Sequence, residues 1–139
     1  GVNDWLNKKL FRSEFMPFAP ILKEEHVDQF FHGAKKVRRC LPFMTTTLQV
    51  TKECAATYKG IVHKDGTARP QSVSKKTNPF LWNVLDRYEA LSGKKILINT
   101  SYNVHEEPIV FNQNHAIKSF VKCEHDHLYY NSTHIRRRS

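Results

Sequence analysis

The stretch Asn78–Asn99, NPFLWNVLDRYEALSGKKILIN, holds the clearest helix of the chain, followed directly by a buried strand. Its Asn-Pro start supplies an N-cap and a residue favoured at the first helical position, and Gly93 supplies a C-terminal stop. Apolar side chains recur between these ends near helical spacing, at Trp82, Leu85, Tyr88 and Leu91. We therefore predict a helix over residues 79–92 and a strand over residues 96–98.

Weaker signals of the same kinds predict further elements on both sides of this stretch. Helices are expected over residues 3–12, 23–32 and 113–122, and strands over residues 43–51, 61–63 and 127–130. Buried apolar faces are expected from Val27, Phe30 and Phe31 in one helix and from Ala116, Ile117, Phe120 and Val121 in another. Residues 15–20 are expected to form an extended buried connection, residues 35–39 a basic loop and residues 52–60 an irregular connection. Interleaved helices and strands predict an α/β (α+β) fold with a mixed sheet, in a single domain over residues 1–139.

Polar side chains follow the strand over residues 96–98 at once. Asn99, Thr100, Ser101 and Asn103 place four amide or hydroxyl groups within five residues. Ligands of open α/β sheets collect at the carboxyl ends of strands, and such donors suit a phosphate or a carbonyl oxygen. The spacing alone favours equally a polar loop rich in turn-forming residues.

The pair Glu106-Glu107 comes next and is followed by Pro108. Adjacent residues on an extended chain face opposite ways, so the two carboxylates are not expected to share one catalytic proton. At most one of them faces a ligand, and the sequence does not choose between them.

A second polar stretch begins at the turn signal Asp65-Gly66. The residues after this turn again offer hydroxyl, guanidinium and amide groups, among them Thr67 and Arg69. The guanidinium of Arg69 can hold a phosphate or carboxylate through two hydrogen bonds.

The chain is basic, with 22 lysine and arginine residues against 13 acidic ones and a net charge of +9. Such a balance predicts affinity for polyanions, nucleotides or phosphorylated metabolites. Three widely spaced cysteines argue against a disulfide framework and indicate a reducing compartment, the cytoplasm. No apolar run is long enough to cross a bilayer, so no membrane partner is expected. The first residue is not methionine, which fits a piece of a longer protein.

Two other kinds of site receive little support from the sequence. The run Glu124-His125-Asp126-His127 has two histidines, too few for a closed metal site, and lacks the ligand spacing of structural zinc. We therefore predict no metal ligands in this chain. Because no glycine-rich phosphate loop is present either, side chains are expected to do much of any nucleotide binding.

Three motifs occur together in one order: Phe15-Met-Pro-Phe-Ala-Pro20, His63-Lys-Asp-Gly-Thr-Ala-Arg-Pro-Gln71 and Asn99-Thr-Ser-Tyr-Asn-Val-His-Glu-Glu-Pro-Ile-Val110. As a set they resemble the C-terminal domain of O-carbamoyltransferases of the nodulation-protein-U and antibiotic-carbamoylating type. The resemblance extends from about Leu6 to Tyr130. Met16 stands where many relatives carry a basic residue, and Tyr102 stands where the family usually has phenylalanine.

The resemblance implies a YrdC-like fold, a twisted mixed sheet flanked by helices. It implies that carbamoyl phosphate and ATP are the substrates, that carbamoyl-adenylate forms, and that the carbamoyl group passes to an acceptor hydroxyl. In such enzymes an N-terminal actin-like domain carries the metal ion and the acceptor site. No equivalent of that domain is found in this chain, so we expect it as a partner and expect no complete transfer without it.

The resemblance also assigns roles to polar and charged residues of the chain. Catalytic roles are expected for Arg69, Ser101 and Asn103, and substrate-binding roles for Lys9, Arg12, His63, Thr67, Asn99, Thr100 and Glu107. The cations would hold the phosphate, and the hydroxyl and amide groups would hold the carbamoyl group.

Two alternatives from other classes are kept. The first is a nucleic-acid-binding YrdC-like module, since the net charge and the runs Lys35–Arg39 and Arg136–Arg138 would suit a phosphate backbone. Nucleic acid is nevertheless the less expected partner, because the aromatic residues lie in apolar patterns and do not alternate with cations. The second is a docking domain without activity of its own.

Overall fold

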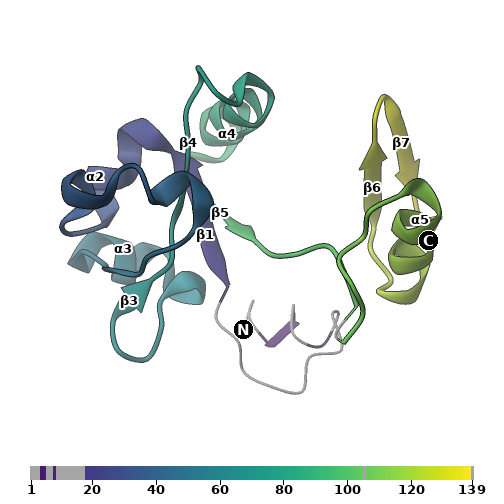
Figure 1. Cartoon of the computed structure of the whole chain (residues 1–139), viewed down its shortest axis with the longest axis horizontal. Helices are drawn as coiled ribbons and strands as arrows, with labels where there is room; N and C mark the ends of the chain where they lie inside the picture. Colours follow the sequence, from purple (N-terminus) through teal and green to yellow (C-terminus); the bar gives the residue numbers. More distant parts are fainter. Residues whose placement is uncertain (1–3, 6–7, 9–17, 105, 139) are drawn as a thin grey trace. The chain divides into compact units, whose positions relative to one another are not determined.

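The structure is a computed structural model that describes residues 4–5, 8, 18–104 and 106–138. Most of the helix predicted over residues 3–12, including Lys9 and Arg12, lies outside the described residues. The described chain packs into two compact units. We call residues 18–100 the sheet unit and residues 101–138 the hairpin unit (Figure 1).

The sheet unit contains most of the secondary structure. In chain order its elements, with η for a 3-10 helix, are β1 (Ala19–Lys23), η1 (Glu24–His26), α2 (Val27–Phe30), η2 (Ala34–Val37), η3 (Leu41–Phe43), β2 (Leu48–Gln49), α3 (Lys52–Thr57), η4 (Lys59–Ile61), β3 (Thr67–Ala68), β4 (Gln71–Val73), α4 (Pro79–Ser92) and β5 (Ile96–Asn99). The hairpin unit contains α5 (Gln113–Lys122), β6 (His127–Tyr130) and β7 (Thr133–Arg136).

The main sheet has three strands in the order β4-β1-β5 (Figure 1). Strand β1 pairs with β4 in parallel and with β5 in antiparallel orientation, so the sheet is mixed. The predicted α/β class is therefore confirmed.

The central strand β1 was not predicted as a strand, because residues 15–20 were expected to be a connection and residues 23–32 a helix. All five of its residues are buried, which fits a strand covered on both faces. Pro20 is tolerated inside it because β5 alone pairs with that residue, whereas the register with β4 starts at Ile21.

Apolar layers cover both faces of this sheet. On one face Ile21, Val73 and Leu85 form a cluster that fixes α4 against the sheet. On the other face Leu22 and Ile96 join the larger core, which includes the buried side chains of Val27, Phe30 and Phe31. The apolar side predicted for the second helix is thus confirmed, although the α-helical part is a single short turn, α2.

Helix α4 has the bounds predicted from its sequence signals. The side chain of Asn78 accepts a hydrogen bond from the backbone N–H of Leu81 at 3.1 Å, which makes it the N-cap. Gly93 adopts a left-handed φ of 67° and ends the helix. Of the predicted apolar face, Leu85 is buried, whereas Leu91 is 74% exposed.

Three predictions between residues 43 and 63 are wrong. The strand expected over residues 43–51 is reduced to β2, which pairs with β3 alone. The connection expected over residues 52–60 contains α3, because Thr51 caps a helix by accepting a hydrogen bond from the N–H of Cys54. The strand expected over residues 61–63 is replaced by the end of η4 and an irregular segment. Threonine favours strands by propensity, but here it serves as a cap.

The hairpin unit is built on α5 and the β6-β7 pair. Helix α5 and strand β6 have the predicted bounds, and Ala116, Phe120 and Leu128 form the core between them. Ile117 and Val121 were expected to be buried but are 38% and 60% exposed, so the buried stripe is narrower than predicted. Strand β7 was not predicted because its sequence, THIR, has no apolar alternation; pairing with β6 forms it.

Candidate functional site

Two amide side chains meet at one end of the main sheet, where β1 begins. Asn99 is the last residue of β5 and Gln71 is the first residue of β4, on opposite sides of β1. The Nδ2 amino group of Asn99 donates a hydrogen bond of 2.6 Å to Oε1 of Gln71. In β1, Ala19 lies opposite Asn99 and Ile21 lies opposite Gln71, so the bond crosses the central strand. We call Asn99 and Gln71 the amide pair.

Two further contacts hold the amide pair in place. Nε2 of Gln71 donates to the backbone carbonyl of Pro42 at 3.2 Å. The amino group of Asn99 also lies 3.7 Å from Sδ of Met44. Gln71 was not among the predicted site residues. It is the last residue of the motif His63–Gln71 and lies two residues after Arg69, so its place in that motif could have indicated it.

Arg69 lies two residues before Gln71, in the segment that enters β4, and its side chain is exposed. Throughout the part of the chain that the structure describes, no carboxylate lies within ion-pair distance of Arg69. A guanidinium without a carboxylate partner is free to bind an anion through two parallel hydrogen bonds.

His63 and Thr67 come together at the turn that precedes β3. Nδ1 of His63 lies 3.0 Å from the hydroxyl of Thr67, which donates a 2.7 Å hydrogen bond to Asp65. The bond from Thr67 lowers the pKa of the Asp65 carboxyl. Gly66 completes the turn with a φ of 78°, so the turn predicted at Asp65-Gly66 is confirmed.

In the hairpin unit, Asn103 and Glu107 shape one loop. The amino group of Asn103 donates to the backbone carbonyls of Val104 at 3.1 Å and Glu107 at 2.8 Å. Its Oδ1 is buried and has no partner in the described part of the chain. Glu106 has a φ of 65°, so the pair Glu106-Glu107 lies in a turn and not on the extended chain that was expected. The two hydrogen bonds from Asn103 therefore stabilise this loop.

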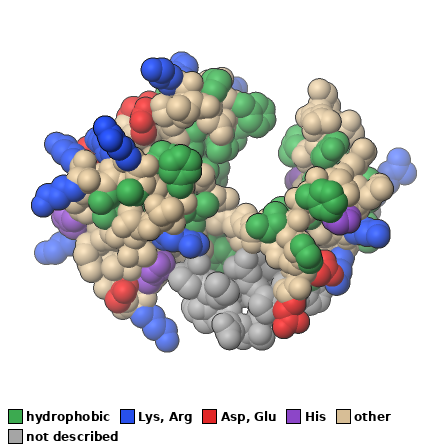
Figure 2. Space-filling model, in the orientation of Figure 1, with side chains coloured by type: hydrophobic (Ala, Val, Ile, Leu, Met, Phe, Trp, Pro, Cys, Tyr) green, Lys and Arg blue, Asp and Glu red, His purple; other side chains and the backbone are tan. Residues whose placement is uncertain are grey.

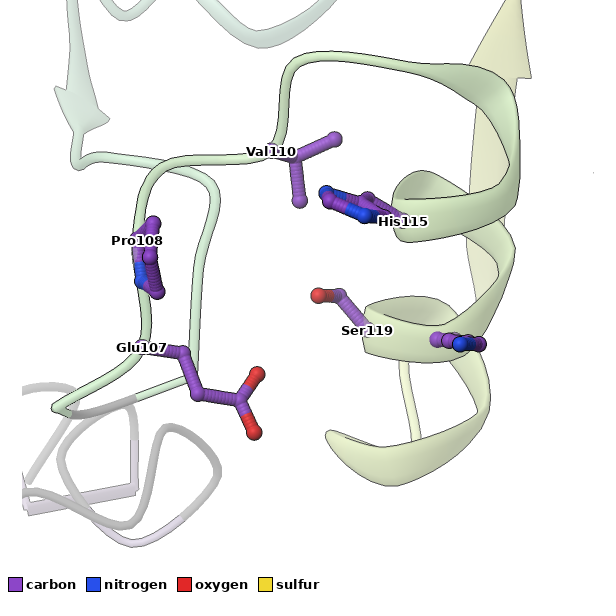
Figure 3. Close-up of a pocket in the computed structure, with 6 residues that line it drawn as sticks. Glu107, Pro108, Val110, His115 and Ser119 are labelled. Atoms are coloured by element: carbon purple, nitrogen blue, oxygen red, sulfur yellow. The ribbon is translucent and has the colours of Figure 1, made fainter.

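A pocket of about 190 Å³ lies between this loop and α5 (Figure 3). Glu107, Pro108 and Val110 line it from the loop, while His115 and Ser119 line it from the helix, together with Lys118. The Glu107 carboxylate forms an ion pair with Lys122 of α5. The lining includes both a carboxylate, Glu107, and an ammonium group, Lys118, so the pocket does not specifically favour an anion. Its size and its apolar walls suit a small polar molecule.

The predicted site residues divide between the two units. His63, Thr67, Arg69, Asn99 and Thr100 belong to the sheet unit, whereas Ser101, Asn103 and Glu107 belong to the hairpin unit. Thr100 is half-buried and Ser101 is exposed at the point where the chain passes from one unit to the other. The predicted roles of these residues, and those of Lys9 and Arg12, stay predictions.

The cysteines show no sign of nucleophilic chemistry. Burial raises the pKa of the Cys54 thiol to about 11, and burial also raises the pKa of Cys123. Both therefore remain neutral thiols near pH 7, as expected for small apolar core residues. Cys40 is exposed, and none of the three forms a disulfide. No three histidine, cysteine or acidic side chains gather to hold a metal ion among the described residues.

The basic segments are dispersed or engaged in local contacts. Arg38 pairs with Asp28, and Arg137 donates to the backbone carbonyls of Phe120 and Val121 at the end of α5. On the face shown in Figure 2, lysine and arginine side chains are scattered over the sheet unit and form no continuous stripe. None of the described helices is long and apolar enough to span a membrane.

A family model described as "Carbamoyltransferase C-terminus" matches residues 1–137. The chain belongs to this carbamoyltransferase C-terminal family. The resemblance carried by the three sequence motifs is thereby confirmed. The matched residues include Arg69, the amide pair and the loop of Asn103.

Curated relatives of this carbamoyltransferase C-terminal chain include nodulation proteins. It is 38% identical to nodulation protein NolO of Bradyrhizobium diazoefficiens over 91% of its own length and 23% of the relative's. It is 34% identical to nodulation protein U of Rhizobium tropici over 75% of its length and 17% of the relative's, and 37% identical to an uncharacterized protein of Methanocaldococcus jannaschii over 88% and 23%. The chain thus spans about a fifth of the length of the curated relatives it matches.

Proposed function

We propose that this chain is the carbamoyl-phosphate-binding part of an O-carbamoyltransferase of the cytoplasm. In the proposed reaction, hydrolysis of carbamoyl phosphate releases phosphate and leaves carbamate, whose oxygen attacks the α-phosphate of ATP to give carbamoyl-adenylate and pyrophosphate. The carbamoyl group then passes to an acceptor hydroxyl and AMP leaves. An N-terminal actin-like domain of the same protein would hold the metal ion and the acceptor. The observation that carries the proposal is the family match over residues 1–137.

The chemistry of the described residues supports this proposal at the end of the sheet where the amide pair lies. The phosphate of the substrate needs a fixed cation, and the exposed guanidinium of Arg69 has no carboxylate partner among the described residues. The planar carbamoyl group needs hydrogen-bonding groups, which the amide pair offers at the end of β5. Attack on the α-phosphate of ATP develops negative charge, which fixed cations and N–H donors stabilise electrostatically. No protein nucleophile is required, which agrees with the neutral thiols.

Calorimetric titration tests the assignment. The ligand is carbamoyl phosphate, inorganic phosphate is the reference anion, and the proteins are the unaltered chain, Arg69→Ala and Arg87→Ala. Arg87 is an exposed residue of α4, so Arg87→Ala removes the same charge away from the segment that enters β4. We expect saturable binding that favours carbamoyl phosphate and falls at least about tenfold in Arg69→Ala, because a charge-assisted bidentate contact is lost.

The control variant distinguishes binding at a specific site from attraction by the overall positive charge of the chain. Arg87→Ala is expected to leave the affinity within about twofold of the unaltered chain, since exposed charges are screened by salt. Equal weakening in both variants, or equal binding of both anions, would refute a specific donor site at Arg69. The absence of saturable binding would refute the proposal that this chain holds the donor.

A further inference from the structure

Two hydrogen bonds of Gln71 fix the orientation of the Asn99 side-chain amide at the end of β5. The backbone carbonyl of Pro42 can only accept, so the group of Gln71 that lies 3.2 Å from it must be the Nε2 amino group. The Oε1 atom of Gln71 then faces Asn99, and an oxygen can only receive a hydrogen bond there. Asn99 consequently donates through Nδ2, at 2.6 Å.

The second N–H of Asn99 also has a neighbour. The thioether sulfur of Met44 lies 3.7 Å from the same nitrogen and is a weak acceptor. No group among the described residues donates to Oδ1 of Asn99, and this oxygen is not one of the buried unpaired atoms. Both contacts engage the amino group of Asn99, so the carbonyl oxygen Oδ1 is the polar atom that Gln71 leaves without a contact among the described residues.

We infer that Oδ1 of Asn99 recognises the NH2 group of the carbamoyl donor, and that Gln71 is the positioning residue that sets this polarity. The inference rests on the proposed function and adds a basis for specificity to it. A carbonyl oxygen repels phosphate oxygens but accepts a hydrogen bond from an amino group. Acetyl phosphate carries a methyl group where carbamoyl phosphate carries NH2, so it leaves this oxygen without a partner.

The experiment measures a ratio of affinities, which a general loss of stability or of positive charge does not change. Dissociation constants for carbamoyl phosphate and acetyl phosphate are determined by calorimetry on the chain, on Gln71→Met and on Gln71→Glu. Methionine lacks the acceptor oxygen, so Asn99 is free to turn its amide. Gln71→Glu places one carboxyl oxygen towards Asn99, which must still donate inward, and the other towards the Pro42 carbonyl, to which it donates only when protonated; a carboxyl that stays ionised also weakens the binding of both anions.

We expect the unaltered chain to prefer carbamoyl phosphate roughly tenfold. The preference should fall to about one in Gln71→Met and be retained in Gln71→Glu, with circular dichroism confirming that both variants are folded. An unchanged ratio in Gln71→Met, or the same loss in both variants, would overturn the role of Gln71. If neither acyl phosphate binds the unaltered chain, the proposed function itself fails, and this inference fails with it.

Discussion

The ion pair between Glu89 of α4 and Lys23 at the end of β1 gives a sharp test of what fixes α4 to the sheet. The two charges lie 2.8 Å apart, and Nε2 of His26 lies 2.9 Å from the same carboxylate oxygen. The side chains of Lys23 and Glu89 are only 10% and 24% exposed, so water screens the contact poorly. We predict that Glu89→Gln destabilises the fold by about 2 kcal/mol, since the amide keeps the shape but loses the charge-assisted hydrogen bonds.

The matched control is Asp86→Asn, which removes the second carboxylate that contacts Lys23. Asp86 approaches Lys23 to 2.6 Å, but its side chain is 51% exposed, and an exposed pair contributes less. We expect a loss of about 0.5 kcal/mol. Urea unfolding followed by Trp82 fluorescence in a Trp5→Phe background measures both changes, because Lys23 lies 4.9 Å from the Trp82 ring. Equal losses in the two variants would refute the argument from burial.

The same pair predicts a dependence on pH. The hydrogen bond from Lys23 lowers the pKa of Glu89 in the folded protein. A carboxyl group whose pKa is lower in the folded than in the unfolded protein stabilises the fold at pH values above its unfolded-state pKa, which is about 4.3 for glutamate. This stabilisation is lost as the pH falls through the folded-state pKa. The stability difference between the unaltered chain and Glu89→Gln should therefore be full at pH 6 and shrink towards pH 3. A difference that stays constant over this range would contradict the assignment.

Two further predictions concern the ends of helices. Replacing the N-cap Asn78 with alanine should cost about 1 kcal/mol in chemical unfolding, while Asn78→Ser should restore most of it; equal losses would show that the cap does not stabilise α4. Arg137 binds the last carbonyls of α5, so Arg137→Ala should cost about 1–2 kcal/mol and speed amide exchange in α5. Arg138→Ala removes the same charge without such contacts among the described residues, and matching exchange rates in the two variants would count against this capping role.

Elements with local signals were predicted closely. Asn78, Pro79 and Gly93 mark the ends of α4 because capping and left-handed φ depend on residues within one turn of each other. The same holds for α5, whose N-cap Asn112 receives the N–H of His115. Elements without such signals were missed: β1 begins at a proline-containing segment, and β7 is formed by pairing with β6.

The sequence by itself determined the α/β class, the two long helices and the family, because these depend on residues close together or on motifs read in order. The tertiary structure decided that β1 is the central strand, that Lys23 meets Glu89, and that Gln71 orients Asn99. These contacts join segments far apart in the chain, and no local preference of either partner indicates the other. Pairing in the sheet brings them together, and burial there gives each hydrogen bond its strength.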